Sequence, residues 1–93
     1  MTEIVWSETA LKTYLNIIDY LFAEWTPKEI DTFEAEVNAL LERIAVNNFL
    51  CKPSLILPYK KCIVNKHTAL IYAVINDVVY LNTFLHNKSN HSY

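Results

Sequence analysis

The apolar positions of the chain follow a helical period first and a strand-like composition later. After a short β-prone opening at residues 4–6, apolar residues recur every three or four positions between Leu11 and Phe22. This spacing predicts a helix with a single apolar stripe. Ser7 is a good N-terminal cap, and we expect the helix to end near Trp25.

A second helix is predicted to begin directly afterwards. Thr26, Pro27 and Glu29 follow the pattern of a capping box with proline at the first helical position. Helical spacing of apolar residues then continues from Ile30 until Asn47 interrupts it. Because only one or two residues connect the helices, we expect them to form an antiparallel hairpin.

Strands are predicted at residues 61–65, 69–75 and 78–85, where β-branched and aromatic residues dominate. Asn76 and Asp77 supply a tight turn, since these types tolerate positive φ best after glycine. Adjacent apolar positions in the last two strands predict a central place in the sheet, with helices over one face. The fold class is therefore α+β, with two layers built as strand, helix, helix and a three-stranded antiparallel meander.

Length and composition exclude several classes of protein. The chain has 93 residues, 53% of them hydrophobic, which predicts one domain over residues 1–93. Glycine is absent, and this excludes phosphate-binding loops and dinucleotide-binding turns, which need a residue free to adopt positive φ. No cofactor is expected. The sequence shows neither a signal pattern nor an apolar run of about 18 residues, so the cytoplasm is the expected compartment and no membrane contact is predicted.

The net charge of −2 hides a division along the chain. Residues 1–51 carry three cations against nine acids, whereas residues 52–93 carry five lysines against Asp77 alone. The second half is a candidate basic surface, although lysines scattered over a solvated face would give the same count. Cys51 and Cys62 match neither a zinc site nor a redox motif, and we expect small buried thiols.

Segments along nearly the whole chain are similar, in order, to one superfamily. Residues 4–21 match an opening strand and a first helix with an I-x-x-Y-L pattern. Residues 59–68 are similar to R-K-C-V-V-x-K-H-T, and residues 83–88 to the start of T-F-F-D-N-R-Q-N-P. The chain thus resembles the RelE/ParE superfamily, the toxins of type II toxin–antitoxin pairs, and within it the ParE-like branch.

Two family arginines are missing from this chain. Ala73 stands where the ParE-like branch has arginine, and Ala69 stands where YoeB-like nucleases have theirs. Residues 70–74 are similar to the L-V-Y-A-V of YoeB-like toxins, and residues 91–93 to their terminal His-Tyr, with Ser92 inserted. The nuclease constellation therefore does not carry over intact.

Metal-independent RNA cleavage needs a proton acceptor, a proton donor and a cation that stabilises the phosphorane. The resemblance makes the following residues weak catalytic candidates: His67, His86, Lys88, His91 and Tyr93. The alternative, which we favour, is that these are turn and tail residues kept polar by solvent. No metal site is predicted.

Partner binding is predicted for a basic cluster and one aromatic residue. We expect the cations of adjacent strands and turns to gather into one patch within a Debye length, about 8 Å. The cluster consists of Lys60, Lys61, Lys66, His67 and Lys88. Trp25, at the tip of the helical hairpin, is expected to be partly exposed.

The resemblance implies a toxin that inhibits an essential target, DNA gyrase in the ParE-like branch, and that a cognate antitoxin neutralises. One alternative is a ribosome-dependent mRNA endoribonuclease of RelE or YoeB type. Another is an inactive protein of the same fold that only binds partners. The acidic helices and the two missing arginines favour binding over RNA cleavage.

Overall fold

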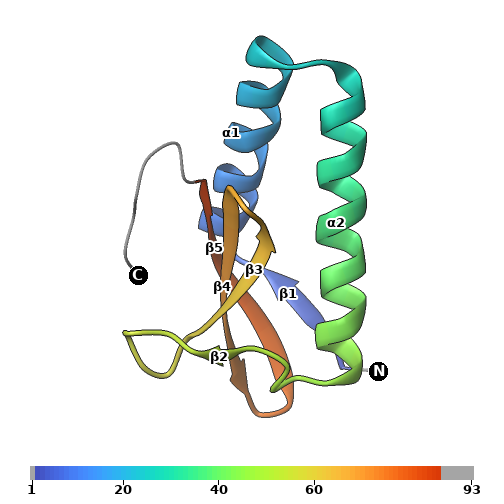
Figure 1. The fold of residues 1–93 in the computed structure, drawn as a ribbon. Coiled ribbons are helices and arrows are strands. Elements are labelled where there is room, and N and C mark those ends of the chain that lie inside the picture. Colours follow the sequence, from blue (N-terminus) through green and yellow to red (C-terminus); the bar gives the residue numbers. More distant parts are fainter. Residues whose placement is uncertain (1, 87–93) are drawn as a thin grey trace.

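Both helices lie against one face of a five-stranded sheet in the computed structural model, which describes residues 2–86 (Figure 1). The elements in chain order are β1 (Ile4–Trp6), α1 (Glu8–Glu24), α2 (Pro27–Val46), β2 (Lys52–Pro53), β3 (Lys60–Asn65), β4 (Thr68–Ile75) and β5 (Val78–His86). This arrangement confirms the predicted two-layer α+β class, the helical hairpin and the three-stranded meander.

Helix α1 is capped and tied to the sheet by one residue. The Ser7 hydroxyl accepts a hydrogen bond from the Ala10 amide at 2.9 Å and donates one to the Asn82 carbonyl, also at 2.9 Å. The predicted cap is therefore confirmed, and the same side chain sets where α1 crosses β5. Ala10 and Ile17 are the buried residues of this helix.

Helix α2 begins at the predicted place, but its capping box is incomplete. Thr26 is the N-cap and Pro27 occupies the first turn, yet the Thr26 side chain makes no capping hydrogen bond to the backbone. Its hydroxyl instead donates to the Glu29 carboxylate, and this bond lowers the pKa of Glu29. The Glu29 amide donates to the Thr26 carbonyl at 3.0 Å. The side-chain part of the cap is thus a hydrogen bond between the side chains of Thr26 and Glu29.

The strand order of the sheet is β1-β5-β4-β3-β2. Strands β3, β4 and β5 form the antiparallel meander, and β4 is central, with Leu70, Ile71 and Tyr72 each 0% exposed. Strand β1 pairs with β5 in parallel, Ile4 lying opposite Val79. The two-residue strand β2 at the other edge was not predicted, because a pair of residues that includes a proline carries no strand pattern.

The turn between β4 and β5 confirms the prediction from residue type. Asn76 has φ of 51° and Asp77 has φ of 64°, so both central residues are left-handed, as a type I′ hairpin turn requires. Among residues 2–86, no helix is both long and apolar enough to cross a membrane.

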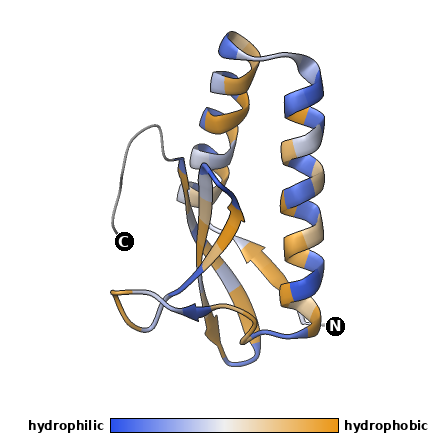
Figure 2. Cartoon of the chain, in the orientation of Figure 1, coloured by the Kyte–Doolittle hydropathy of each residue, from blue (hydrophilic) through white to orange (hydrophobic). Residues whose placement is uncertain are grey.

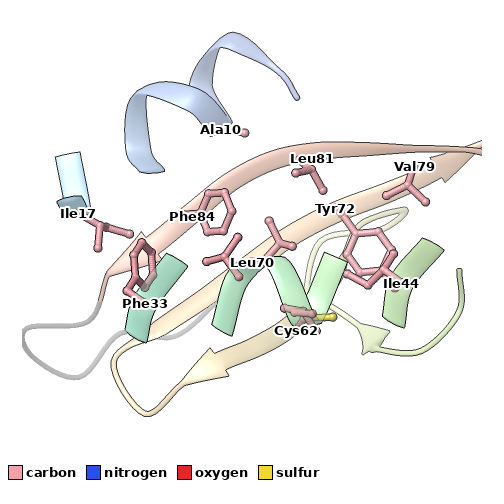
Figure 3. Close-up of a cluster of buried hydrophobic side chains, with 12 residues drawn as sticks. Ala10, Ile17, Phe33, Ile44, Cys62, Leu70, Tyr72, Val79, Leu81 and Phe84 are labelled. Carbon is pink, nitrogen blue, oxygen red and sulfur yellow. The ribbon is translucent and has the colours of Figure 1, made fainter. Parts of the chain in front are cut away.

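The hydrophobic core lies between the helices and the sheet, as the close-up shows (Figure 3). Its largest fully buried side chains include Tyr72, Ile44, Leu70 and Leu81. The Tyr72 hydroxyl reaches past the core and donates to the Asn48 carbonyl at 2.8 Å. Burial raises the pKa of Tyr72.

The prediction of two free thiols is wrong, because Cys51 and Cys62 form a disulfide. Cys62 lies in β3 and is 1% exposed, whereas Cys51 precedes β2, and their Cα atoms are 5.3 Å apart. That separation is within the range that a disulfide spans. The bond joins the segment after α2 to the sheet.

Candidate functional site

A cleft of about 500 Å³ opens between the tip of the helical hairpin and the end of the sheet formed by the β3–β4 turn and His86. Four residues of α1 and its C-cap line one wall, at the spacing that puts them on one side of a helix. They are Ile17, Tyr20, Leu21 and Trp25. Ile17 is 3% exposed and Trp25 is 55% exposed, so the wall runs from a buried apolar floor to an open aromatic rim. This confirms the predicted exposure of Trp25.

The opposite wall is the β3–β4 turn, which hydrogen bonds hold against α2. The Asn65 side chain accepts from the His67 amide at 2.8 Å and donates to the Glu36 carboxylate at 3.1 Å. One residue therefore shapes the turn and fixes it to the helix. Lys66 and His67, both exposed, are presented at the mouth of the cleft.

His86 lies at the end of β5, where it is paired with Thr68. Its Nδ1 atom is 3.5 Å from the Thr68 hydroxyl. The His86 ring lies between two others, with its centroid 4.9 Å from that of Tyr20 and 6.4 Å from that of His67. Three rings from three separate elements thus form a row along the cleft.

The cleft has an apolar floor and a rim of mixed charge. Lys28 and Lys66 face it together with Glu29 and Glu36. Such a combination suits an amphipathic peptide segment, whose apolar side chains fill the floor while its polar ones meet the rim. Within the described part of the chain, no three His, Cys, Asp or Glu side chains gather as a metal site.

The structure brings together Trp25, Lys66, His67 and His86 of the predicted site residues. Lys60 and Lys61 lie at the other end of β3, and Lys60 is about 17 Å along the strand from Asn65, the residue before Lys66. Successive residues of a strand also point to opposite faces. The cations of the predicted patch that the structure describes thus lie toward the two ends of β3, and their gathering with Lys88 into one patch stays a prediction. Lys88, His91 and Tyr93 lie outside the described residues.

Sequence reasoning missed Glu36 and Asn65 as parts of the site. From the sequence, Glu36 is one of several acids on the polar side of its helix, and Asn65 is a turn residue. Only the hydrogen bond between the two side chains, which joins α2 to the β3–β4 turn, shows that both belong to the site. Tyr20 belongs to the I-x-x-Y-L pattern of the first helix, and this pattern is the sequence feature that could have indicated its place in the site.

The family model described as "ParE toxin of type II toxin-antitoxin system, parDE" matches residues 4–90. The chain belongs to this ParE toxin family. The match spans β1 to β5 and includes the cleft. Comparison with curated proteins finds no significant match.

Solved structures of toxin–antitoxin systems share the fold of this ParE-family chain. The chromosomal ParDE system from P. aeruginosa aligns with a TM-score of 0.78 at 11% identity, covering 92% of this chain and 96% of the other. The intact E. coli RelBE complex aligns at 0.64 and 14% identity, covering 96% and 100%. The YoeB–YefM complex from Staphylococcus aureus aligns at 0.62 and 19% identity, covering 94% and 98%. At these identities the likeness shows the fold alone.

Proposed function

We propose that residues 1–93 act as one toxin domain in the cytoplasm, inhibit DNA gyrase, and are neutralised by an antitoxin segment that occupies the cleft. The observation that carries this proposal is the match of residues 4–90 to the ParE toxin family. The fold's likeness to toxins of several toxin–antitoxin complexes supports it.

Helix α1 also offers an exposed apolar stripe outside the lining of the cleft for a helical antitoxin segment. Leu11 and Leu15 are each 49% exposed and Phe22 is 75% exposed, and their spacing of four and seven residues forms one stripe along α1. An apolar stripe left open on a helix is typical of surfaces that accept an amphipathic helix. The acids of α1 and α2 favour a segment with basic residues on its polar side.

The second candidate is a metal-independent endoribonuclease, and the row of rings favours it. His67 and His86, with centroids 6.4 Å apart, supply the imidazoles that general acid–base catalysis uses most often. Against it, Ala69 and Ala73, at the positions of family arginines, are 8% and 3% exposed. These positions provide no cation for a phosphorane, so we place gyrase inhibition first.

A paired assay separates the two functions. Purified protein is added to gyrase supercoiling reactions, and mRNA ends are mapped in cells after induction without antitoxin. We expect loss of supercoiling and a DNA-damage response. Intact supercoiling at excess protein, with mRNA cut at codon-related positions, would reverse the order of the two functions. No growth arrest at all would indicate a protein that only binds partners.

Antitoxin binding is tested on the stripe. Calorimetric titration with the antitoxin encoded by the neighbouring reading frame should show affinity reduced by about tenfold or more in Leu15→Glu, because a carboxylate is placed in an apolar contact. Ala23→Glu adds the same charge at an exposed position of α1 outside the stripe and serves as the control. Equal affinity for both variants would show that the antitoxin binds elsewhere.

A further inference from the structure

The loop between β2 and β3 exposes three consecutive aliphatic side chains. Leu55 is 79% exposed, Ile56 is 52% exposed and Leu57 is 75% exposed. Residues 55–57, which we call the apolar tip, project at the end of the sheet opposite to the tip of the hairpin (Figures 1 and 2). None of the three belongs to the core cluster. Core packing therefore does not explain them, and a loop tip is ordinarily polar.

Internal hydrogen bonds hold the apolar tip in a defined shape. The Ser54 hydroxyl donates to the Ile56 carbonyl at 2.8 Å and accepts from the Ile56 amide at 3.0 Å. The Ser54 amide donates to the Tyr59 carbonyl at 2.8 Å, and the Tyr59 amide to the Ile56 carbonyl at 3.1 Å. The Cys51–Cys62 disulfide braces the base of the loop. The aliphatic side chains are thus presented on an ordered backbone.

Three lysines stand at the base of this loop, Lys52 and Lys61 on one face of the sheet and Lys60 on the other. Lys52 lies directly opposite Lys61 across the β2–β3 pair, and Lys60 lies opposite Pro53. Lys60 Nζ is 5.1 Å from the centroid of the exposed Phe49 ring. Within residues 2–86 none of the three forms an ion pair with a carboxylate. Like charges directly opposite in a sheet are destabilising, and Lys52 and Lys61 are such a pair.

We propose that the apolar tip and the paired Lys52 and Lys61 form the surface that engages the toxin's target, by inserting the tip into an apolar recess rimmed with carboxylates on a protein. This inference rests on the proposed toxin function and names the surface that would carry it. The lysines provide the charge complementarity that steers association. The ordered loop lowers the entropy lost on docking.

Two other classes of partner fit these observations less well. A fluid bilayer has no fixed recess, so it gives no reason for the hydrogen bonds that shape the loop. Single-stranded nucleic acid is held by aromatic stacking as well as by cations, and the tip is aliphatic. The surface also lies at the end of β3 remote from the cleft, so toxin and antitoxin contacts can be separated by mutation.

The test compares two double variants that remove similar amounts of exposed aliphatic surface. Leu55→Ser/Leu57→Ser changes the apolar tip, whereas Ile63→Ser/Ile75→Ser changes side chains that are 66% and 50% exposed on the strands. Each purified protein is assayed for gyrase inhibition and antitoxin affinity, and growth arrest is scored in cells. The tip variant should need about 100-fold more protein for half-inhibition, as expected for two aliphatic side chains lost from an interface. Its antitoxin affinity and melting temperature should match those of the control.

Lys52→Glu/Lys61→Glu provides an independent variant. Its rate of association with gyrase should be at least tenfold lower than that of the wild type and should no longer decrease as the salt concentration is raised. Equal growth arrest by the wild type and the tip variant would overturn the inference while leaving the toxin function intact. A wild type that causes no arrest would instead overturn the toxin function. Binding to vesicles of phosphatidylglycerol and phosphatidylethanolamine that is lost only in the tip variant would replace the protein recess with a membrane.

Discussion

The hydroxyl of Thr13 offers a sharp test of how α1 is attached to the sheet. Strand β1 ends at Trp6, so among residues 2–86 no strand pairs with the outer edge of β5 beyond Leu81. Thr13, on α1, substitutes for that strand by accepting a hydrogen bond from the Phe84 amide at 2.9 Å. The same hydroxyl donates to the Thr9 carbonyl at 2.8 Å. We predict that Thr13→Val destabilises the fold although it preserves the shape of the side chain.

The expected loss of stability in Thr13→Val follows from the burial of Phe84, whose amide donates the hydrogen bond. Phe84 is 3% exposed, so its amide loses its acceptor in a place that water reaches poorly. An unsatisfied buried donor costs about 1–3 kcal/mol. In a domain of this size, each 1 kcal/mol lowers the melting temperature by about 4–8 °C. Valine and threonine have similar helix propensities, so the loss reports the hydrogen bond.

The assay is urea unfolding followed by circular dichroism, with two controls. Thr9→Val makes the same chemical change at an exposed position one turn earlier and should stay within about 0.5 kcal/mol of the wild type. Thr13→Ser keeps the hydroxyl and should retain most of the stability. If Thr13→Val unfolds at the same urea concentration as Thr9→Val, the amide has another acceptor and our account of the α1–β5 junction is refuted.

Two further predictions concern the sulfur bridge and the buried tyrosine. Reducing the Cys51–Cys62 disulfide, which closes a short loop with a sequence separation of 11, should lower the free energy of unfolding by about 2–3 kcal/mol; an unchanged urea midpoint in dithiothreitol would contradict this. Burial raises the pKa of Tyr72, so the folded state holds this proton more tightly than the unfolded state does, and stability should fall as pH rises above about 10. Tyr72→Phe removes the hydrogen bond and should lower the free energy of unfolding by about 1 kcal/mol at pH 7. Between pH 9 and 11 the stability of this variant should fall less steeply than that of the wild type. Parallel stability curves for the two proteins over this pH range would exclude the role of Tyr72.

Most of the secondary structure could be predicted from the sequence alone, because it depends on interactions between residues that are near one another in the chain. The cap at Ser7 and the break at Asn47 depend on neighbouring residues, and the structure has helix boundaries at both. Asn76 and Asp77 predicted their turn because their conformational preference belongs to the residues themselves. The sequence also indicated the family, because segments similar to RelE/ParE toxins follow one another in order along the chain. The family model confirms this by matching residues 4–90.

Only the tertiary structure decided which distant residues meet. Cys51 and Cys62 bond because β2 pairs with β3, and no spacing rule encodes that pairing. Lys60 and Lys66 look adjacent in the sequence, but the extended strand between them holds them apart. Glu36 and Asn65 are 29 residues apart and form a direct hydrogen bond between α2 and the β3–β4 turn at the cleft. Such contacts depend on how whole elements pack against one another, and the pattern along a single chain does not carry that information.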